Sequence, residues 1–246
     1  MLDILNVKYS TDVIREKRKE ITEILMSKSA RVKDGVIRSL STEELSQLFC
    51  LYDRIFFMDW FKENFKGRLK FSLSRRMTKS AGLTICPKNP EKIKPEDLTL
   101  EIRIGVDFFL QYETIQGSKS VGGIEAGNSL EALQLVFEHE LCHVIEFINY
   151  KKSNCKGKRF KKLAENLFGH TESCHRLPTQ RQIARQKLGL NIGDMVSFEF
   201  KGKRMTGILY NINKRATIMV KNSKGAFIDN RGNRYSKYYI PLNLLQ

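Results

Sequence analysis

The chain has 246 residues, of which 41% are hydrophobic and 28% charged, and its formal net charge is +16. These proportions are ordinary for a globular protein, and the length suffices for one large domain or two small ones. No apolar run approaches the roughly 20 residues of a membrane-spanning helix, and no signal peptide is recognisable at the first residues. Five widely spaced cysteines favour reduced thiols and a cytoplasmic location over a disulfide framework.

The positive charge is concentrated in one part of the chain. Residues 1–150 contain 22 Lys and Arg against 22 Asp and Glu, whereas residues 151–246 contain 21 against 5. This asymmetry predicts a polyanionic partner for the C-terminal part, and we expect nucleic acid, in particular DNA. A generally basic surface is the alternative. No basic amphipathic helix of the membrane-surface type is present, so no membrane partner is expected.

Helical and extended patterns alternate in the first part of the chain. Residues 11–28 have helical propensity and a thin apolar stripe. A second helix is predicted to begin after Ser41, because Ser41–Glu44 has the S-x-x-E form of a capping box. Alternating apolar residues predict half-buried strands at 69–73 and 98–104, with a loop over 87–95 between them.

Two further helices are predicted after a flexible connection over residues 117–127, which contain four glycines. The first follows Asn128, a good N-cap with Glu131 three residues later, and it has a wide apolar face. The second covers residues 158–168, and Gly169 stands where a glycine commonly ends a helix.

The first of these two helices contains the sequence His139-Glu140-Leu141-Cys142-His143, an H-E-x-x-H motif. Residues i and i+4 lie on the same face of a helix, so the two imidazoles can hold one Zn²⁺. The glutamate between them can act as a general base on water. Two unrelated histidines on a solvated helix are the alternative. The motif therefore predicts a zinc site with His139 and His143 as ligands and Glu140 as the base.

The surroundings of this motif resemble the SprT-like (Spartan-related) zinc metalloprotease family. The resemblance rests on His139–His143, Gly157–Phe160 and Phe168–Thr171, and it covers residues 41–177. It implies an α+β fold with a zincin-like domain, in which helices pack on a small antiparallel sheet. It also implies a bound zinc ion and, as substrates, proteins that are associated with or crosslinked to DNA.

The third zinc ligand is the open question. In the family it is a histidine directly before the glycine of G-x-x-F, and that position is Lys156 here. A protonated ammonium has no lone pair for zinc. The neighbouring Cys155 could supply a thiolate, His170 or His175 could fold back from beyond the next helix, or the site could have decayed. The carboxylate of Glu146 is a further alternative.

These observations predict a zinc-dependent metallopeptidase acting on DNA-associated or DNA-crosslinked proteins. The alternative is a catalytically impaired scaffold that binds nucleic acid, because Lys156 occupies the family's ligand position. A closed structural site, for instance with Cys155 and Cys174 added to the two motif histidines, is a third possibility. In such a site Glu140 would have no chemical task.

The resemblance and a change in composition near Pro178 together divide the chain. Residues 1–40 are expected to be a helical extension, and the resemblance implies a zincin-like domain over residues 41–177. Residues 178–192 are expected to be a basic linker, and 193–246 a small, basic, all-β barrel, because short alternating strands are separated by Gly, Asn and Lys turns. This last part resembles small SH3-like barrels. Aromatic residues interleaved with cations in that last part suit single-stranded nucleic acid.

Overall fold

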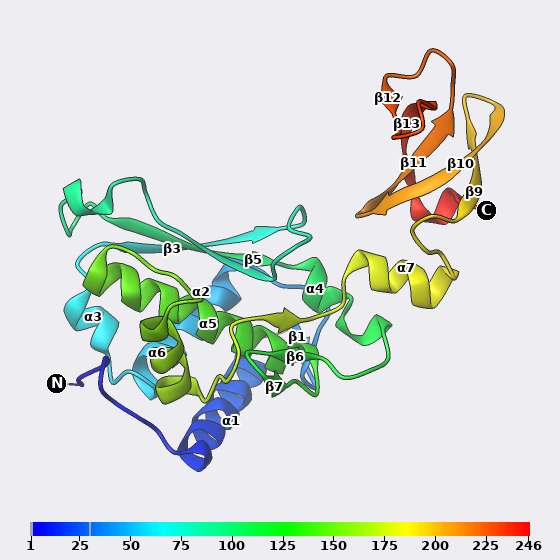
Figure 1. The fold of residues 1–246 in the computed structure, drawn as a ribbon. Coiled ribbons are helices and arrows are strands. Elements are labelled where there is room, and N and C mark those ends of the chain that lie inside the picture. Colours follow the sequence, from blue (N-terminus) through cyan, green and yellow to red (C-terminus); the bar gives the residue numbers. More distant parts are fainter. Residues whose placement is uncertain (1, 30) are drawn as a thin grey trace. The chain divides into compact units, whose positions relative to one another are not determined.

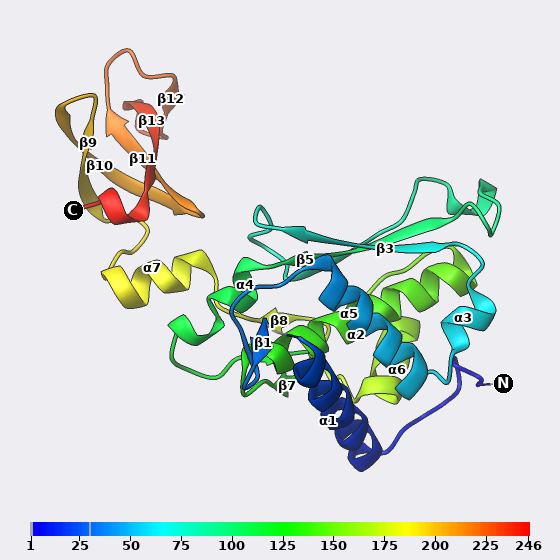
Figure 2. The ribbon, with the colours of Figure 1, turned by 180° about the vertical axis from the view of Figure 1, so that it is seen from behind.

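The computed structural model describes residues 2–29 and 31–246, which form two compact units that divide between Leu177 and Pro178 (Figures 1 and 2). The first unit contains the H-E-x-x-H motif, and the second contains the basic β-rich tail. Within the described residues, none of the helices combines the length and the apolar character that crossing a bilayer requires.

The first unit mixes helices with short strands. In chain order its elements are α1 (Thr11–Lys28), β1 (Val32–Lys33), β2 (Val36–Ile37), α2 (Thr42–Ile55), α3 (Trp60–Asn64), β3 (Arg68–Ser74), β4 (Gly82–Ile85), η1 (Pro90–Lys92), β5 (Thr99–Gly105), α4 (Asp107–Leu110), η2 (Tyr112–Thr114), β6 (Ser120–Val121), β7 (Ile124–Glu125), α5 (Ser129–Tyr150), α6 (Lys158–Phe168) and β8 (His175–Arg176). The prediction of an α+β fold is confirmed.

The main sheet of this unit has three strands in the order β3-β5-β4 and lies along one side of α2 and α5 (Figures 1 and 2). β3 pairs with β5 in parallel, and β4 pairs with β5 antiparallel. The expected antiparallel sheet is therefore a mixed one. The reason is that β5, whose Leu100, Ile102 and Ile104 are fully buried, takes the central position between two strands that precede it.

The predicted helices begin and end at the residues that were expected to cap them. The backbone N–H of Ser41 donates to Glu44 Oε2 at 2.7 Å, which completes the capping box of α2. The Asn128 side chain accepts a hydrogen bond of 2.9 Å from the N–H of Glu131 at the start of α5. Gly169 ends α6 with a left-handed φ of 69°. Local sequence signals thus define these helices.

Helix α5 occupies the interior of the first unit. Nearly all of its side chains from Ser129 to Glu146 are buried, including the charged Glu138, Glu140 and Glu146. Buried carboxylates are costly unless they are paired or hydrogen-bonded. The burial of α5 therefore explains why each of these glutamates has dedicated partners on other elements.

The segment 117–127, expected to be a flexible connection, contains β6 and β7. β6 pairs with β7 and, on its other side, with β8, so that Val121 lies opposite His175 and Ser120 opposite Arg176. Strands of two residues have no recognisable period in the sequence. This pairing places the segment after α6 next to the segment before α5.

The second unit consists of α7 (Gln180–Leu188), β9 (Met195–Phe200), β10 (Lys203–Ile212), β11 (Arg215–Lys221), β12 (Phe227–Ile228), β13 (Arg234–Pro241) and η3 (Leu242–Leu244). The strands form an open antiparallel sheet in the order β12-β13-β11-β10-β9, so the expected closed barrel is not found among the described residues. The edge strand β9 exchanges hydrogen bonds with Gln246 instead. The expected linker contains α7, whose Ala184 is buried in the core of this unit.

Candidate metal centre

The two histidines of the motif lie on the same face of α5, as their spacing predicts. The ring centroids of His139 and His143 are 5.0 Å apart. Phe160, near the start of α6, packs against both rings, with centroid distances of 4.8 Å to His139 and 4.5 Å to His143. The helix spacing and this shared aromatic contact hold the two imidazoles side by side.

Two sets of donor atoms in this region are close enough to hold a metal ion. His139, His143 and Cys155 form one set, and His139, Glu140 and His175 form the other; within each set the donor atoms lie within 4.8 Å of one another. His139 belongs to both sets. The structure thus brings together five of the residues singled out from the sequence, among them His175 from β8.

His143 is oriented by a chain of hydrogen bonds. Its Nδ1 lies 2.6 Å from Ser153 Oγ, and that hydroxyl donates to Glu146 Oε2 at 2.6 Å. Because the hydroxyl proton goes to the carboxylate, Nδ1–H donates to Ser153, and the lone pair of His143 is on Nε2. Glu146 also receives a 2.6 Å hydrogen bond from Arg159 Nε, so this carboxylate serves as a support for His143.

His139, His143 and His175 are held in the neutral form. Burial, together with the neighbouring imidazoles, lowers the pKa of His139 to about 2, and burial lowers the pKa of His143 and of His175 to about 4. Neutral imidazole is the form that binds metals. The Nδ1 atoms of His139 and His175 are buried without a hydrogen-bond partner, which costs about 1–3 kcal/mol each. These residues therefore fit a divalent metal such as Zn²⁺.

Glu140 is buried beside the strand β4. Thr84 Oγ1 donates a hydrogen bond of 2.7 Å to Glu140 Oε2, and burial raises the pKa of the Glu140 carboxyl to about 7. A Cβ atom on Gly82 would lie only 2.5 Å from Glu140 Oε1, so the glycine makes room for the carboxylate. A carboxylate with a pKa near neutrality is suited to general-base catalysis.

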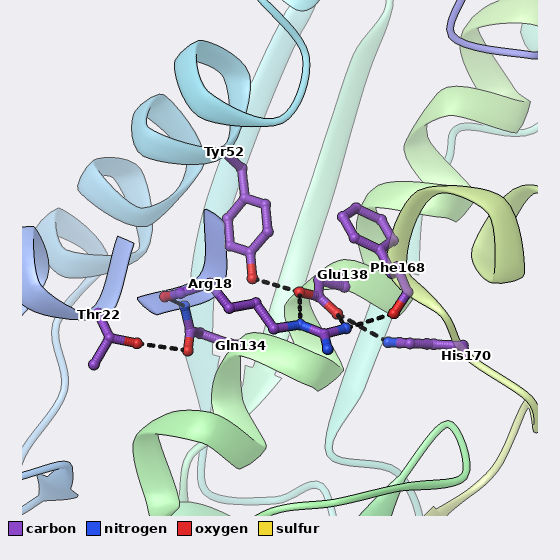
Figure 3. Close-up of polar contacts among 7 residues, drawn as sticks. All are labelled: Arg18, Thr22, Tyr52, Gln134, Glu138, Phe168 and His170. Carbon is purple, nitrogen blue, oxygen red and sulfur yellow. Dashed lines mark hydrogen bonds and ion pairs between the residues drawn. The ribbon is translucent and has the colours of Figure 1, made fainter. Parts of the chain in front are cut away.

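His170, a second candidate ligand, lies in neither set of donors. Its Nε2 is 2.9 Å from Glu138 Oε2, in a buried network that Figure 3 shows. Arg18 donates to both oxygens of Glu138 and to the carbonyl of Phe168, and Tyr52 donates to Glu138 Oε1 at 2.8 Å. Burial by itself would raise the pKa of Glu138, but Arg18 and His170 hold it below its ordinary value. His170 thus serves this network.

The remaining candidates from the sequence lie outside both sets of donors. Lys156, at the family's third-ligand position, is exposed, and its backbone N–H donates to Asn154 Oδ1 at 3.0 Å. Cys174 is exposed and its thiol donates to Glu172. The sequence alone gave His175 no priority, because no spacing rule connects it to the motif across α6.

The sequence model of the SprT-like family matches residues 46–182, which is more than half of the chain. The chain belongs to the SprT-like family. Families of this type are generally metal-dependent and metallopeptidase-like, and the matched region includes the motif on α5, the following loop with Cys155, and His175 on β8. Neither the comparison with curated proteins nor the comparison with solved structures gives a match.

Proposed function

We propose that this SprT-like protein is a zinc-dependent metallopeptidase that cleaves proteins associated with or crosslinked to DNA. The observation that carries the proposal is the geometry around α5, where two neutral imidazoles, one buried (His139) and one half-buried (His143), lie next to a carboxylate with a pKa near 7. Metal-assisted peptide hydrolysis requires three protein ligands and a base, and these residues supply two of the ligands and the base.

Each residue has a distinct task in this reaction. His139 and His143 would hold the zinc ion, together with a third ligand from Cys155 or His175. When bound, zinc polarises the scissile carbonyl and lowers the pKa of the attacking water. Glu140 takes the proton from that water and passes it to the departing amine. Thr84 keeps the carboxylate of Glu140 in place through its 2.7 Å hydrogen bond.

The strand next to Glu140 is suited to an extended peptide. β4 lies at the edge of the three-stranded sheet, and its Thr84 contacts Glu140 directly. An edge strand has unpaired backbone N–H and C=O groups, to which a peptide in extended conformation can add as a further strand. The exposed side chain of Leu83 on β4 could contact such a peptide.

The second unit carries a surface suited to nucleic acid. Tyr239 and Lys237 of β13 alternate with the buried Ile240, so they lie on the other face of the sheet. Tyr210 stands at an irregularity of β10 between Leu209 and Asn211 and is also exposed. Tyr210 and Tyr239 are 61% and 59% exposed. Exposed aromatic rings beside cations bind single-stranded nucleic acid by stacking and charge. The high positive charge after residue 150 supports the same partner.

A second candidate function is a scaffold that binds nucleic acid without cleaving protein. The observation that favours it is the exposed Lys156 at the position where the family has its third ligand. If neither Cys155 nor His175 replaces that ligand, zinc binding would be too weak for catalysis. The metal content of the purified protein separates the two functions at the first step.

The test compares the wild-type chain with Glu140→Gln, both zinc-loaded, on a basic protein substrate bound to single-stranded DNA. The wild type is expected to cleave the substrate, and the variant is expected to be about 10²–10⁴-fold slower, as is typical for loss of a general base. Both proteins should retain equal amounts of zinc. Equal cleavage rates, or no cleavage by zinc-loaded wild type, would contradict the peptidase function.

A further inference from the structure

The strand β8 carries a histidine that the H-E-x-x-H motif does not include. The ring centroid of His175 lies 5.0 Å from that of His139, the same separation as between His139 and His143. A donor atom of His175 lies within 4.8 Å of those of His139 and Glu140. Its Nδ1 is buried and has no hydrogen-bond partner. A buried, unpartnered nitrogen in a set of metal-binding side chains has the properties of a ligand.

The backbone around His175 is fixed by hydrogen bonds to β6 and the turn after it. His175 lies opposite Val121 in the antiparallel pair of β6 and β8, and the N–H of Gly122 donates to the Cys174 carbonyl at 2.9 Å. The Gly122 carbonyl accepts from the N–H of Thr171 at 2.8 Å. The position of His175 is thus determined by contacts that form without a metal.

The same segment is attached to α5 through the buried network of Figure 3. His170, five residues before His175, binds Glu138, the residue that directly precedes His139. Gly122 has a φ of +61°, and a Cβ there would lie 2.6 Å from His170 Nδ1, so the turn and the His170 ring are in close contact. The network therefore ties the segment that carries His175 to the helix that carries His139.

Cys155 is the competing donor. It lies in the connection between α5 and α6, is partly exposed, and has a donor atom within 4.8 Å of those of His139 and His143. However, it lies outside every strand, whereas His175 is part of a paired one. A catalytic zinc site has three protein ligands and keeps its fourth position for water or substrate. A donor atom of His175 lies within 4.8 Å of a carboxylate oxygen of Glu140, the residue that must reach that water.

We propose that His175 is the third zinc ligand, so that His139, His143 and His175 form a three-histidine site in place of the family's ligand at the Lys156 position. His139 belongs to both donor sets, and its ring centroid lies 5.0 Å from that of His143 and 5.0 Å from that of His175, so His139 is the residue that the two other imidazoles share. This inference rests on the proposed zinc-dependent function, and it names the residue that compensates for Lys156.

The first test measures the zinc affinity of the full chain by competition with a chromophoric chelator. His175→Ala is expected to weaken zinc binding by more than about 100-fold, because even the loss of an outer-shell partner costs about 10–100-fold. The matched control, Cys155→Ala, should change the zinc affinity by less than about tenfold, which is less than the loss of an outer-shell partner costs. Circular dichroism of the metal-free proteins shows whether each variant is folded.

The second test identifies the ligand by spectroscopy, independently of activity and of small losses in stability. In the Cys155→Ala background, Co²⁺ bound to the protein should give no thiolate-to-metal charge-transfer absorption in the near ultraviolet. Adding His175→Cys to that background should retain tight binding and produce the absorption, because a thiolate at position 175 then coordinates the metal.

The outcomes separate this inference from the proposed function. If His175→Ala binds zinc as tightly as the wild type, the role of His175 is wrong. If wild-type Co²⁺ protein shows a thiolate absorption that Cys155→Ala removes, Cys155 is the ligand and the role of His175 is again wrong. In both cases the proposed peptidase function stands. If the wild-type chain binds no zinc, the inference and the proposed function both fail.

Discussion

Arg18 of α1 and Glu138 of α5 form a bidentate ion pair, with Nε 2.7 Å from Oε1 and Nη2 2.6 Å from Oε2. The Glu138 side chain is 0% exposed and that of Arg18 is 19% exposed. Since residue 138 directly precedes His139, the pair attaches the N-terminal helix to the motif. Residues 1–40, expected to be an N-terminal helical extension, thus contribute to the core that holds the candidate metal centre.

Arg18→Met should strongly destabilise the first unit, because it leaves the buried charge of Glu138 without its main partner. Breaking a buried ion pair from one side typically costs about 3–5 kcal/mol. Urea unfolding followed by the fluorescence of Trp60, the single tryptophan, reports on this unit alone. Arg15→Met, which removes an exposed pair with Asp12, is the control and should cost less than about 1 kcal/mol. Equal losses for the two variants would contradict the prediction.

Ser153→Ala should weaken zinc binding without removing a ligand. The hydroxyl of Ser153 connects His143 Nδ1 to Glu146, and loss of such an outer-shell partner typically costs about 10–100-fold in metal affinity. The measurement is chelator competition on the full chain. Ser118→Ala, at an exposed serine that binds Glu125, is the control and should leave the affinity unchanged. An unchanged affinity of Ser153→Ala would show that His143 is oriented by other contacts.

Gly82→Ala should reduce catalysis and leave zinc binding intact. The added Cβ would lie 2.5 Å from Glu140 Oε1, so the carboxylate must move. Displacement of a catalytic group by about 1 Å can cost about 10²-fold in rate. The rate of substrate cleavage and the zinc content are measured together. Gly127→Ala, whose Cβ would approach only the exposed tip of Glu131, is the control. Full activity of Gly82→Ala would argue against Glu140 as the base.

Tyr210→Ala and Tyr239→Ala should each weaken the binding of single-stranded DNA. Stacking of one base on an aromatic side chain contributes about 1–3 kcal/mol, which corresponds to about 5–150-fold in affinity. Fluorescence anisotropy with a labelled oligonucleotide at several salt concentrations measures the loss. The affinity of the wild type should fall as salt rises, because phosphate contacts release counterions. Val13→Ala, at a partly exposed residue of α1, should bind like the wild type. Salt-independent binding would contradict a phosphate-contacting surface.

The turn between β12 and β13 should lose its structure in acid. Asp229 accepts hydrogen bonds from Asn233, Arg231 and Tyr235, and the Asn233 side chain in particular lowers the pKa of its carboxyl from 3.8 to about 2. A lowered pKa stabilises the folded state above pH 3.8, and this contribution is lost as the pH falls toward 2. The NMR shifts of Tyr235 should follow this titration, and Asp229→Asn should abolish it. An identical acid response in the variant would contradict the prediction.

The sequence alone was sufficient for the four longer helices α1, α2, α5 and α6 and for the motif. The capping box at Ser41, the N-cap at Asn128 and the stop at Gly169 act within a few residues, so they are readable without a fold. The parallel pairing of β3 with β5 could not be predicted, because the position of a strand in a sheet depends on contacts between distant segments.

The candidate site divides in the same way. His139, Glu140 and His143 were predicted because residues four positions apart in an α-helix lie on the same face. This spacing is a property of local backbone geometry. The environments of His170 and His175 were decided only by tertiary structure. His170 contacts Glu138, which also forms a buried ion pair with Arg18 of α1. The pairing of two residues of β6 with β8 places His175 beside His139. Such contacts join segments separated by whole helices, and no local pattern in the sequence encodes them.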